Sequence, residues 1–187
     1  MNALVILTTL SVWACISLAD KVKDVCPDKV VKSSTKLLKV YNGTCYQFFK
    51  DHDVKKQYWE AQDECKRKKG LLAMPKTKEI NQFLVNTLKE FKIKEPVFIG
   101  LDDIRDDGVF RWADGKVLRG SGVYHNFAKG NGILRRMSQW DPFRLMDDYD
   151  CVTLDPSKNK WVDVDCRRNL VQRISKWEKN RLFICEY

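Results

Sequence analysis

The sequence predicts a single α+β domain that is stabilised by disulfides. Three observations support this fold class. The 187 residues are close to the length of one domain. Two helix-like apolar stripes precede a series of short strand-like runs, and the chain holds seven cysteines. The composition, with 44% hydrophobic and 32% charged residues, is typical of a folded domain and not of a disordered chain.

The N-terminal segment predicts secretion. Residues 3–18 carry no charge, and they are fewer than the roughly 20 residues that a bilayer-spanning helix needs. Ser17 and Ala19 are the small residues expected before a signal-peptidase site. We therefore expect residues 1–19 to be a signal peptide and residues 20–187 to form a mature extracellular domain without a transmembrane anchor. The alternative, an uncleaved signal anchor, would need basic residues before the apolar stretch, and none precedes it.

The cysteine count predicts three disulfides. Removal of Cys15 with the signal peptide leaves six cysteines, and an even number in a secreted chain is typical of a disulfide framework. No cysteine is then left for a covalent partner chain. Spacing alone does not choose the pairing among Cys26, Cys45, Cys65, Cys151, Cys166 and Cys185.

Two helices are expected in the first half of the chain. Apolar residues from Val54 to Cys65 recur at helical spacing, and Gly70 suits the position just after the end of such a helix. A second helix follows Pro75, where Thr77 can cap its N-terminus. Its apolar stripe comprises Ile80, Phe83, Leu84, Leu88 and Phe91.

Short strand-like runs occupy most of the remaining chain. They cover residues 45–49, 97–101, 110–112, 151–154 and 182–187. Residues 161–166 alternate strictly, with Val162 and Val164 on one face and Trp161 and Asp163 on the other. Because the helices come early and the strands late, the order favours an α+β fold over alternating βαβ units.

Charge is unevenly distributed along the chain. The net charge is +9, but residues 102–107 carry −3 and residues 141–165 carry −4, so the rest carries +16. Such acidic segments suit a hard cation such as Ca²⁺, and solvated acidic loops are the alternative interpretation. The basic surplus favours anionic surfaces, sulfated glycans or acidic proteins as partners, whereas nucleic acid is not expected as a partner of a secreted chain.

No short catalytic motif is present. The chain has two histidines, His52 and His125, which is too few for a typical catalytic zinc site. The motifs GxSxG, HExxH, GxxxxGK[ST] and GxGxxG are absent. The sequence therefore predicts that the protein is not an enzyme. One glycosylation sequon occurs at Asn42-Gly43-Thr44, and we expect a glycan on Asn42, with an unused site as the alternative.

A series of motifs resembles the C-type lectin-like domain family. The motifs are GTCYQF at residues 43–48, YWEA at 58–61, LLA at 71–73, FIGL at 98–101, WADG at 112–115, WVDVDC at 161–166 and ICE at 184–186. The resemblance covers nearly all of the expected mature chain. It implies a long-form C-type lectin-like fold, in which two helices flank antiparallel strands and a long loop region carries the ligand site. It also implies the disulfides Cys26–Cys45, Cys65–Cys185 and Cys151–Cys166.

The resemblance implies a primary calcium and sugar site, but the residues at its positions are degraded. Asp141 stands at the first ligand position and Asp163 is retained, whereas Phe143, Tyr149 and Val162 replace residues that ligate the ion in sugar-binding members. Losing three ligand side chains is expected to abolish useful Ca²⁺ affinity. We expect ligand contacts from Asp141, Asp163, Trp140, Phe143 and Tyr149.

A second, auxiliary calcium position of the family is better preserved. Asp103, Asp107 and Asp150 match its carboxylates, although Arg144 stands where another acid is usual. The resemblance thus leaves a structural Ca²⁺ at this position as the one cofactor to expect.

These features together predict a secreted carbohydrate-recognition protein, with innate immunity among the roles that the family serves. The alternative is a non-sugar interaction protein, or an extracellular-matrix or mineral-surface-binding protein. That alternative would act through two basic loops, at residues 130–139 and 167–184, which are longer than is usual in the family.

Overall fold

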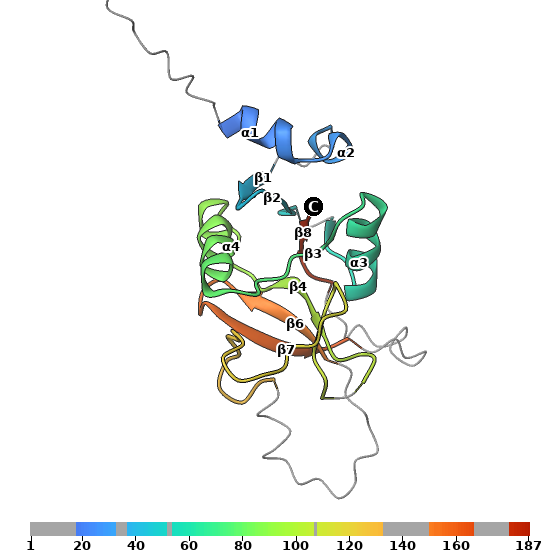
Figure 1. Ribbon diagram of the computed structural model, residues 1–187, viewed down its shortest axis with the longest axis vertical. Helices are drawn as coiled ribbons and strands as arrows, with labels where there is room; N and C mark the ends of the chain where they lie inside the picture. Colours follow the sequence, from blue (N-terminus) through green and yellow to red (C-terminus); the bar gives the residue numbers. More distant parts are fainter. Residues whose placement is uncertain (1–17, 33–36, 52–53, 107, 133–149, 167–179) are drawn as a thin grey trace, which may run out of the picture.

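The computed structural model describes residues 18–32, 37–51, 54–106, 108–132, 150–166 and 180–187. Figure 1 shows strands in the centre of the molecule, with one long helix on either side of them. The predicted α+β class, with two helices flanking antiparallel strands, is therefore confirmed. Among the helices of these ranges, none is long and apolar enough to cross a membrane.

The strands form two antiparallel sheets. The first has the order β1-β2-β8-β3, built from Leu38–Tyr41, Thr44–Phe48, Ile184–Glu186 and Leu71–Leu72. The second has the order β5-β4-β6-β7, built from Arg111–Trp112, Val97–Asp102, Asp150–Asp155 and Lys160–Asp165. In the first sheet, β8 from the end of the chain lies between β2 and β3, so the last residues complete a sheet that starts at β1.

The two flanking helices are α3 (Tyr58–Arg67) and α4 (Lys78–Glu90). The predicted cap of α4 is confirmed, because the Thr77 hydroxyl accepts the Ile80 backbone N–H at 3.3 Å. The first helix begins later than the apolar spacing predicted. A capping box between Gln57 and Glu60 starts it at Tyr58, and Val54 lies before it.

The N-terminal part contains structure that the sequence pattern did not predict. Two short helices, α1 (Leu18–Val25) and α2 (Asp28–Val31), precede β1. The Cys26–Cys45 disulfide joins them to β2. Their apolar side chains pack in a small cluster against β1, including Val30, which is completely buried. The turn between β1 and β2 is exposed at Asn42, and Asn42 and Gly43 both have positive φ, 48° and 73°.

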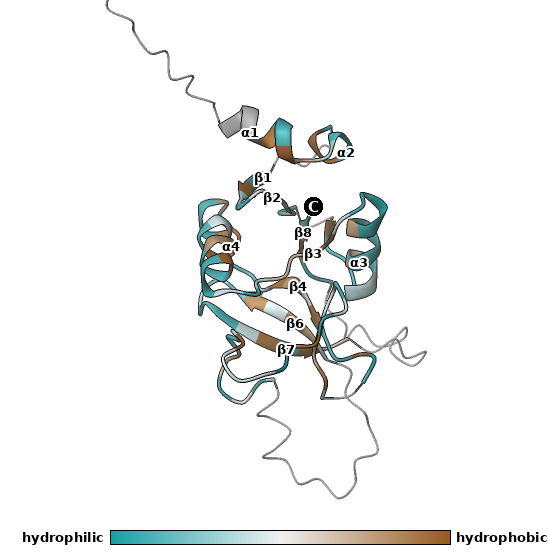
Figure 2. Ribbon diagram, in the orientation of Figure 1, coloured by the Kyte–Doolittle hydropathy of each residue, from teal (hydrophilic) through white to brown (hydrophobic). Residues whose placement is uncertain are grey.

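The structure contains the three disulfides that the family resemblance implies. Besides Cys26–Cys45, they are Cys65–Cys185, which joins α3 to β8, and Cys151–Cys166, which joins β6 to the residue after β7. Figure 2 shows hydrophobic residues concentrated on the central strands. The main core lies between α4 and the two sheets, with Leu84, Ile99 and Trp161 among its fully buried residues.

Candidate functional site

The described part of the expected ligand region is built on β7 and the segment 124–132. Trp161 of β7 is completely buried and makes edge-to-face contacts with Tyr124 and Phe127, with ring centroids 5.6 and 5.5 Å apart. The Trp161 backbone N–H donates to the Asn126 carbonyl at 2.9 Å, and the Ala128 N–H donates to the Trp161 carbonyl at 2.8 Å. The segment is thereby held along β7 like a short additional strand.

Asp163 forms hydrogen bonds with the end of the segment 124–132. One oxygen of its carboxylate accepts the Gly132 backbone N–H at 3.3 Å, and its own N–H donates to the Asn131 side-chain oxygen, also at 3.3 Å. Only 7% of Asp163 is exposed. A buried carboxylate is stable as a charge only when hydrogen bonds or cations compensate it, so the backbone N–H of Gly132 contributes to stabilising this one.

Gly132 is required by its position. Its φ is +70°, and a Cβ added there would lie 2.5 Å from the ring of Phe127. Only glycine combines this backbone conformation with so close an approach to an aromatic ring. Our sequence interpretation did not assign a role to Asn131 or Gly132. The Gly130-Asn131-Gly132 motif was a turn signal that could have indicated them.

A buried hydrogen-bond network connects β7 to α4. The Trp161 indole N–H donates to the Asn81 side-chain oxygen at 2.7 Å, and the Asn81 amide donates to the Asn159 side-chain oxygen at 2.7 Å. Asn81 is 1% exposed. Because buried polar groups are costly when unpaired, this network sets the orientation of Trp161 relative to the helix. An isolated asparagine on the apolar side of a helix was the signal for it in the sequence.

The described residues do not by themselves supply a calcium site at the primary position. Asp163 is the single expected ligand that lies within them, and Val162, which is half-buried, offers no side-chain oxygen. Within the described ranges, no three side chains of His, Cys, Asp or Glu are grouped so that they could hold a metal ion. The other expected ligand-contact residues, Trp140, Asp141, Phe143 and Tyr149, lie outside those ranges.

The auxiliary calcium position is described in part. Asp103 is 1% exposed, and its carboxylate accepts the Gly108 backbone N–H at 2.9 Å, which closes the turn between them. Asp107 lies outside the described residues, and Asp150 is placed as the first residue of β6. Beside Asp103, burial raises the pKa of Asp102, although its carboxylate accepts hydrogen bonds from the Tyr58 hydroxyl and the Ile104 N–H.

Comparisons of this chain with a family model and with known proteins agree on one family of domains. The family model described as the lectin C-type domain matches residues 54–172. Snaclec botrocetin subunit beta from Bothrops jararaca is 27% identical over 150 residues, which cover 79% of this chain and 92% of that protein. Collectin-11 from Bos taurus is 30% identical over 114 residues, which cover 59% of this chain and 36% of that protein. The matches to the collectins thus span less than half of their length.

Solved structures show the same fold. Human lithostathine superposes with a TM-score of 0.58 at 23% identity, covering 81% of this chain and 97% of that chain. The carbohydrate-recognition domain of human scavenger receptor C-type lectin superposes with a TM-score of 0.57 at 24% identity, covering 83% of this chain and 98% of that chain.

Proposed function

The chain belongs to the C-type lectin domain family, a non-enzymatic binding fold, and on this premise we propose that it is a secreted protein that recognises carbohydrate through its long-loop region. In this proposal the primary calcium position is degraded, so the protein binds its ligand without an ion there. One of the similar solved structures is, by its title, a carbohydrate-recognition domain, and the proposal takes its ligand class from that likeness while it leaves out an ion at the primary position.

The observation that carries the proposal is the role of Asp163. Its carboxylate is buried and accepts the Gly132 N–H, while the adjacent Val162 has no ligating oxygen. Calcium sites in proteins take 6–8 oxygen ligands. A position that keeps one aspartate, beside a valine that offers no oxygen, supports recognition by side chains in place of recognition through a bound cation.

The proposed ligand contacts come from residues 133–149, which follow Gly132 and lie outside the described residues. Asp141 supplies a polar contact, and Trp140, Phe143 and Tyr149 supply surfaces on which the apolar face of a sugar ring can pack. Asp163 contributes a further polar contact from β7. A structural Ca²⁺ at the auxiliary position, held by Asp103, Asp107 and Asp150, is part of the proposal. There it would bring the loop at residues 103–108 together with the start of β6.

The proposal includes processing of the chain. Residues 1–19 are removed as a signal peptide, residues 20–187 form the mature domain, and Asn42 carries a glycan at the exposed tip of the β1–β2 hairpin. Cleavage after Ala19 would remove the first two residues of α1. The three disulfides are of the kind that persists in an oxidising extracellular compartment, and innate immunity is one setting for such a protein.

A glycan array probed in calcium and again in EDTA tests the proposal. The protein is purified from the medium of cells that express the full chain, and mass spectrometry of its N-terminus reports the cleavage site. We expect glycan binding that persists in EDTA and is weakened about tenfold by Trp140→Ala. The proposal would be overturned if EDTA abolishes all glycan binding, or if Trp140→Ala weakens binding to none of the glycans that the protein binds.

A second candidate function rests on the charge distribution. A remainder of +16 outside the two acidic segments favours adsorption to an anionic protein, matrix or mineral surface through the basic loops. This function predicts no binding to the neutral glycans of the array. It also predicts retention on a heparin or hydroxyapatite column that falls steeply as the salt concentration rises through about 0.15 M. Retention that salt does not change would exclude it.

A further inference from the structure

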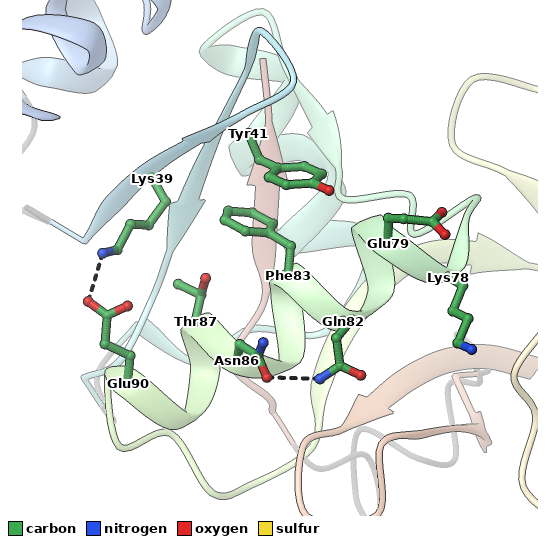
Figure 3. Close-up of a pocket in the computed structure, with 9 residues that line it drawn as sticks. All are labelled: Lys39, Tyr41, Lys78, Glu79, Gln82, Phe83, Asn86, Thr87 and Glu90. Carbon is green, nitrogen blue, oxygen red and sulfur yellow. Dashed lines mark hydrogen bonds and ion pairs between the residues drawn. The ribbon is translucent and has the colours of Figure 1, made fainter.

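A groove lies between β1 and α4. Its volume is about 620 Å³, within the range of roughly 300–1,000 Å³ that is typical of small-molecule sites. Figure 3 shows β1 contributing Lys39 and Tyr41 and α4 contributing the other wall. Asp163, the one expected ligand contact among the residues that the structure describes, does not line this groove.

The apolar part of the groove is a pair of aromatic rings. Tyr41 and Phe83 are stacked, with ring centroids 4.5 Å apart and planes inclined by 14°. Phe83 also contacts Tyr46 behind it, with centroids 5.3 Å apart. Tyr41 and Phe83 are both half-buried, so part of the pair remains accessible to a ligand.

The polar part of the groove is a row of neutral side chains on α4. Gln82 donates to the Asn86 side-chain oxygen at 2.8 Å, and both residues are exposed. The bond fixes the orientation of the Asn86 amide, whose NH₂ group has two donors. Amides pre-oriented beside an aromatic surface suit a ligand that has hydroxyl groups at its edge and an apolar face.

The charged groups of the groove balance one another. Lys39 and Glu90 form an ion pair of 2.7 Å at one end, and Lys78 and Glu79 lie at the other end. An anionic ligand would meet Glu79 and Glu90, and a basic peptide would meet Lys39 and Lys78. Because the described residues that line the groove carry no net charge, they are complementary to a neutral ligand.

We propose that this groove is a second carbohydrate site, which binds a neutral oligosaccharide with a sugar face against Tyr41 and its hydroxyl groups on Asn86. It goes beyond the proposed function, because it places recognition on β1 and α4 and not on the loop after Gly132. The two sites use different residues, so either can fail without the other.

The test is binding in EDTA to an array of neutral oligosaccharides based on mannose, glucose, galactose and N-acetylglucosamine. The protein is first treated with an endoglycosidase, so that a glycan on Asn42 cannot reach the groove. We expect at least one such glycan to bind, with about tenfold weaker affinity for Tyr41→Ala and a several-fold loss for Asn86→Ala. Tyr41→Phe keeps the ring and is expected to bind like the unchanged protein.

Two control variants separate the outcomes. Lys89→Ala changes an exposed residue of α4 outside the groove and should leave binding unchanged. Trp140→Ala should leave binding at the groove unchanged and weaken binding at the long loop. The groove is not a carbohydrate site if no neutral oligosaccharide binds in EDTA, or if Tyr41→Ala and Asn86→Ala bind all of them as the unchanged protein does. If Trp140→Ala loses binding while Tyr41→Ala and Asn86→Ala do not, the result would support the proposed function and overturn the second site.

Discussion

Glu186 in β8 is a carboxyl group whose environment makes stability depend on pH. Burial raises its pKa to about 7, although it accepts the Met74 backbone N–H at 2.9 Å and lies near Lys76. The nearby Asp114 adds to the rise. A raised pKa means that the folded state binds the proton more tightly than the unfolded chain does. The protonated Glu186 side chain therefore contributes its full stabilisation below pH 4.5, the usual pKa of a glutamate. This contribution is lost as the pH rises through about 7, the pKa of Glu186 in the folded state.

Glu186→Gln should remove this pH dependence. The glutamine oxygen can still accept the Met74 N–H, and the side chain stays neutral at every pH. For the unchanged protein we expect the free energy of unfolding to fall by about 2 kcal/mol between roughly pH 5 and pH 8 because of this group. In Glu186→Gln, the free energy of unfolding should fall by about 2 kcal/mol less over the same pH range. Urea unfolding at several pH values measures it, with the exposed Glu90→Gln as control; equal pH profiles for Glu186→Gln and the unchanged protein would contradict the prediction.

At the scale of elements, β4 joins the two sheets. Gly100 of β4 donates its N–H to the Ala73 carbonyl and accepts the Ala113 N–H, both at 2.8 Å. A Cβ on Gly100 would lie 2.5 Å from the Leu72 carbonyl oxygen and 2.9 Å from the Ala113 Cβ. The close approach of β3 to β4 thus depends on the absence of a side chain at Gly100.

Gly100→Ala is expected to separate the two sheets slightly and to destabilise the fold by about 1–3 kcal/mol, the usual cost of overpacking a core. The Leu72 oxygen belongs to the backbone, so it cannot turn away as a flexible side chain could. Guanidinium unfolding monitored by circular dichroism measures the change. Ala113→Gly in the same chain should restore part of the loss, because it relieves the second contact. If Gly100→Ala were as stable as the unchanged protein, the prediction would be wrong, because the two sheets would be able to move apart at no cost.

At the scale of the whole molecule, the Cys65–Cys185 disulfide connects the first half of the domain to its last strand. It spans 120 positions, whereas Cys151–Cys166 spans 15. All four cysteines are buried, with exposed fractions of 0 to 1%. Their replacement by alanine removes similar side chains from the core, so a comparison of the two pairs isolates the length of the closed loop.

Replacing Cys65 and Cys185 together by alanine should therefore cost more stability than replacing Cys151 and Cys166 together. In the chain-entropy account the longer loop contributes about 1.5–2 kcal/mol more, from roughly 3 for the short loop to nearly 5 for the long one. Thermal unfolding of the two double variants under identical conditions gives the order. The reverse order would mean that the two regions differ in how well they relax around the missing sulfur atoms.

Local patterns in the sequence were sufficient to predict several elements. Thr77 marks the start of α4 because a threonine side chain can satisfy a free N–H at a helix N-terminus, whatever lies around it. The predicted alternation of side chains in β7 is also confirmed, because successive residues of a strand face opposite sides of the sheet. The sequence pattern did not predict the helices α1 and α2. They have few apolar residues, and these residues pack against β1 in the folded protein, where the Cys26–Cys45 disulfide holds them.

The fold class, the helix cap and the number of cysteines in disulfides could be predicted without a structure, because each depends on composition or on residues close together in the chain. Which face of β7 is covered depends instead on the packing of the segment 124–132 against it. The valine face looks apolar, yet Val162 and Val164 are half-buried, while Trp161 and Asp163 are buried under the segment 124–132. Packing of the elements also brings Tyr41 and Phe83 together in a stack. Contacts between residues so far apart depend on how the elements pack, and no local pattern records that packing.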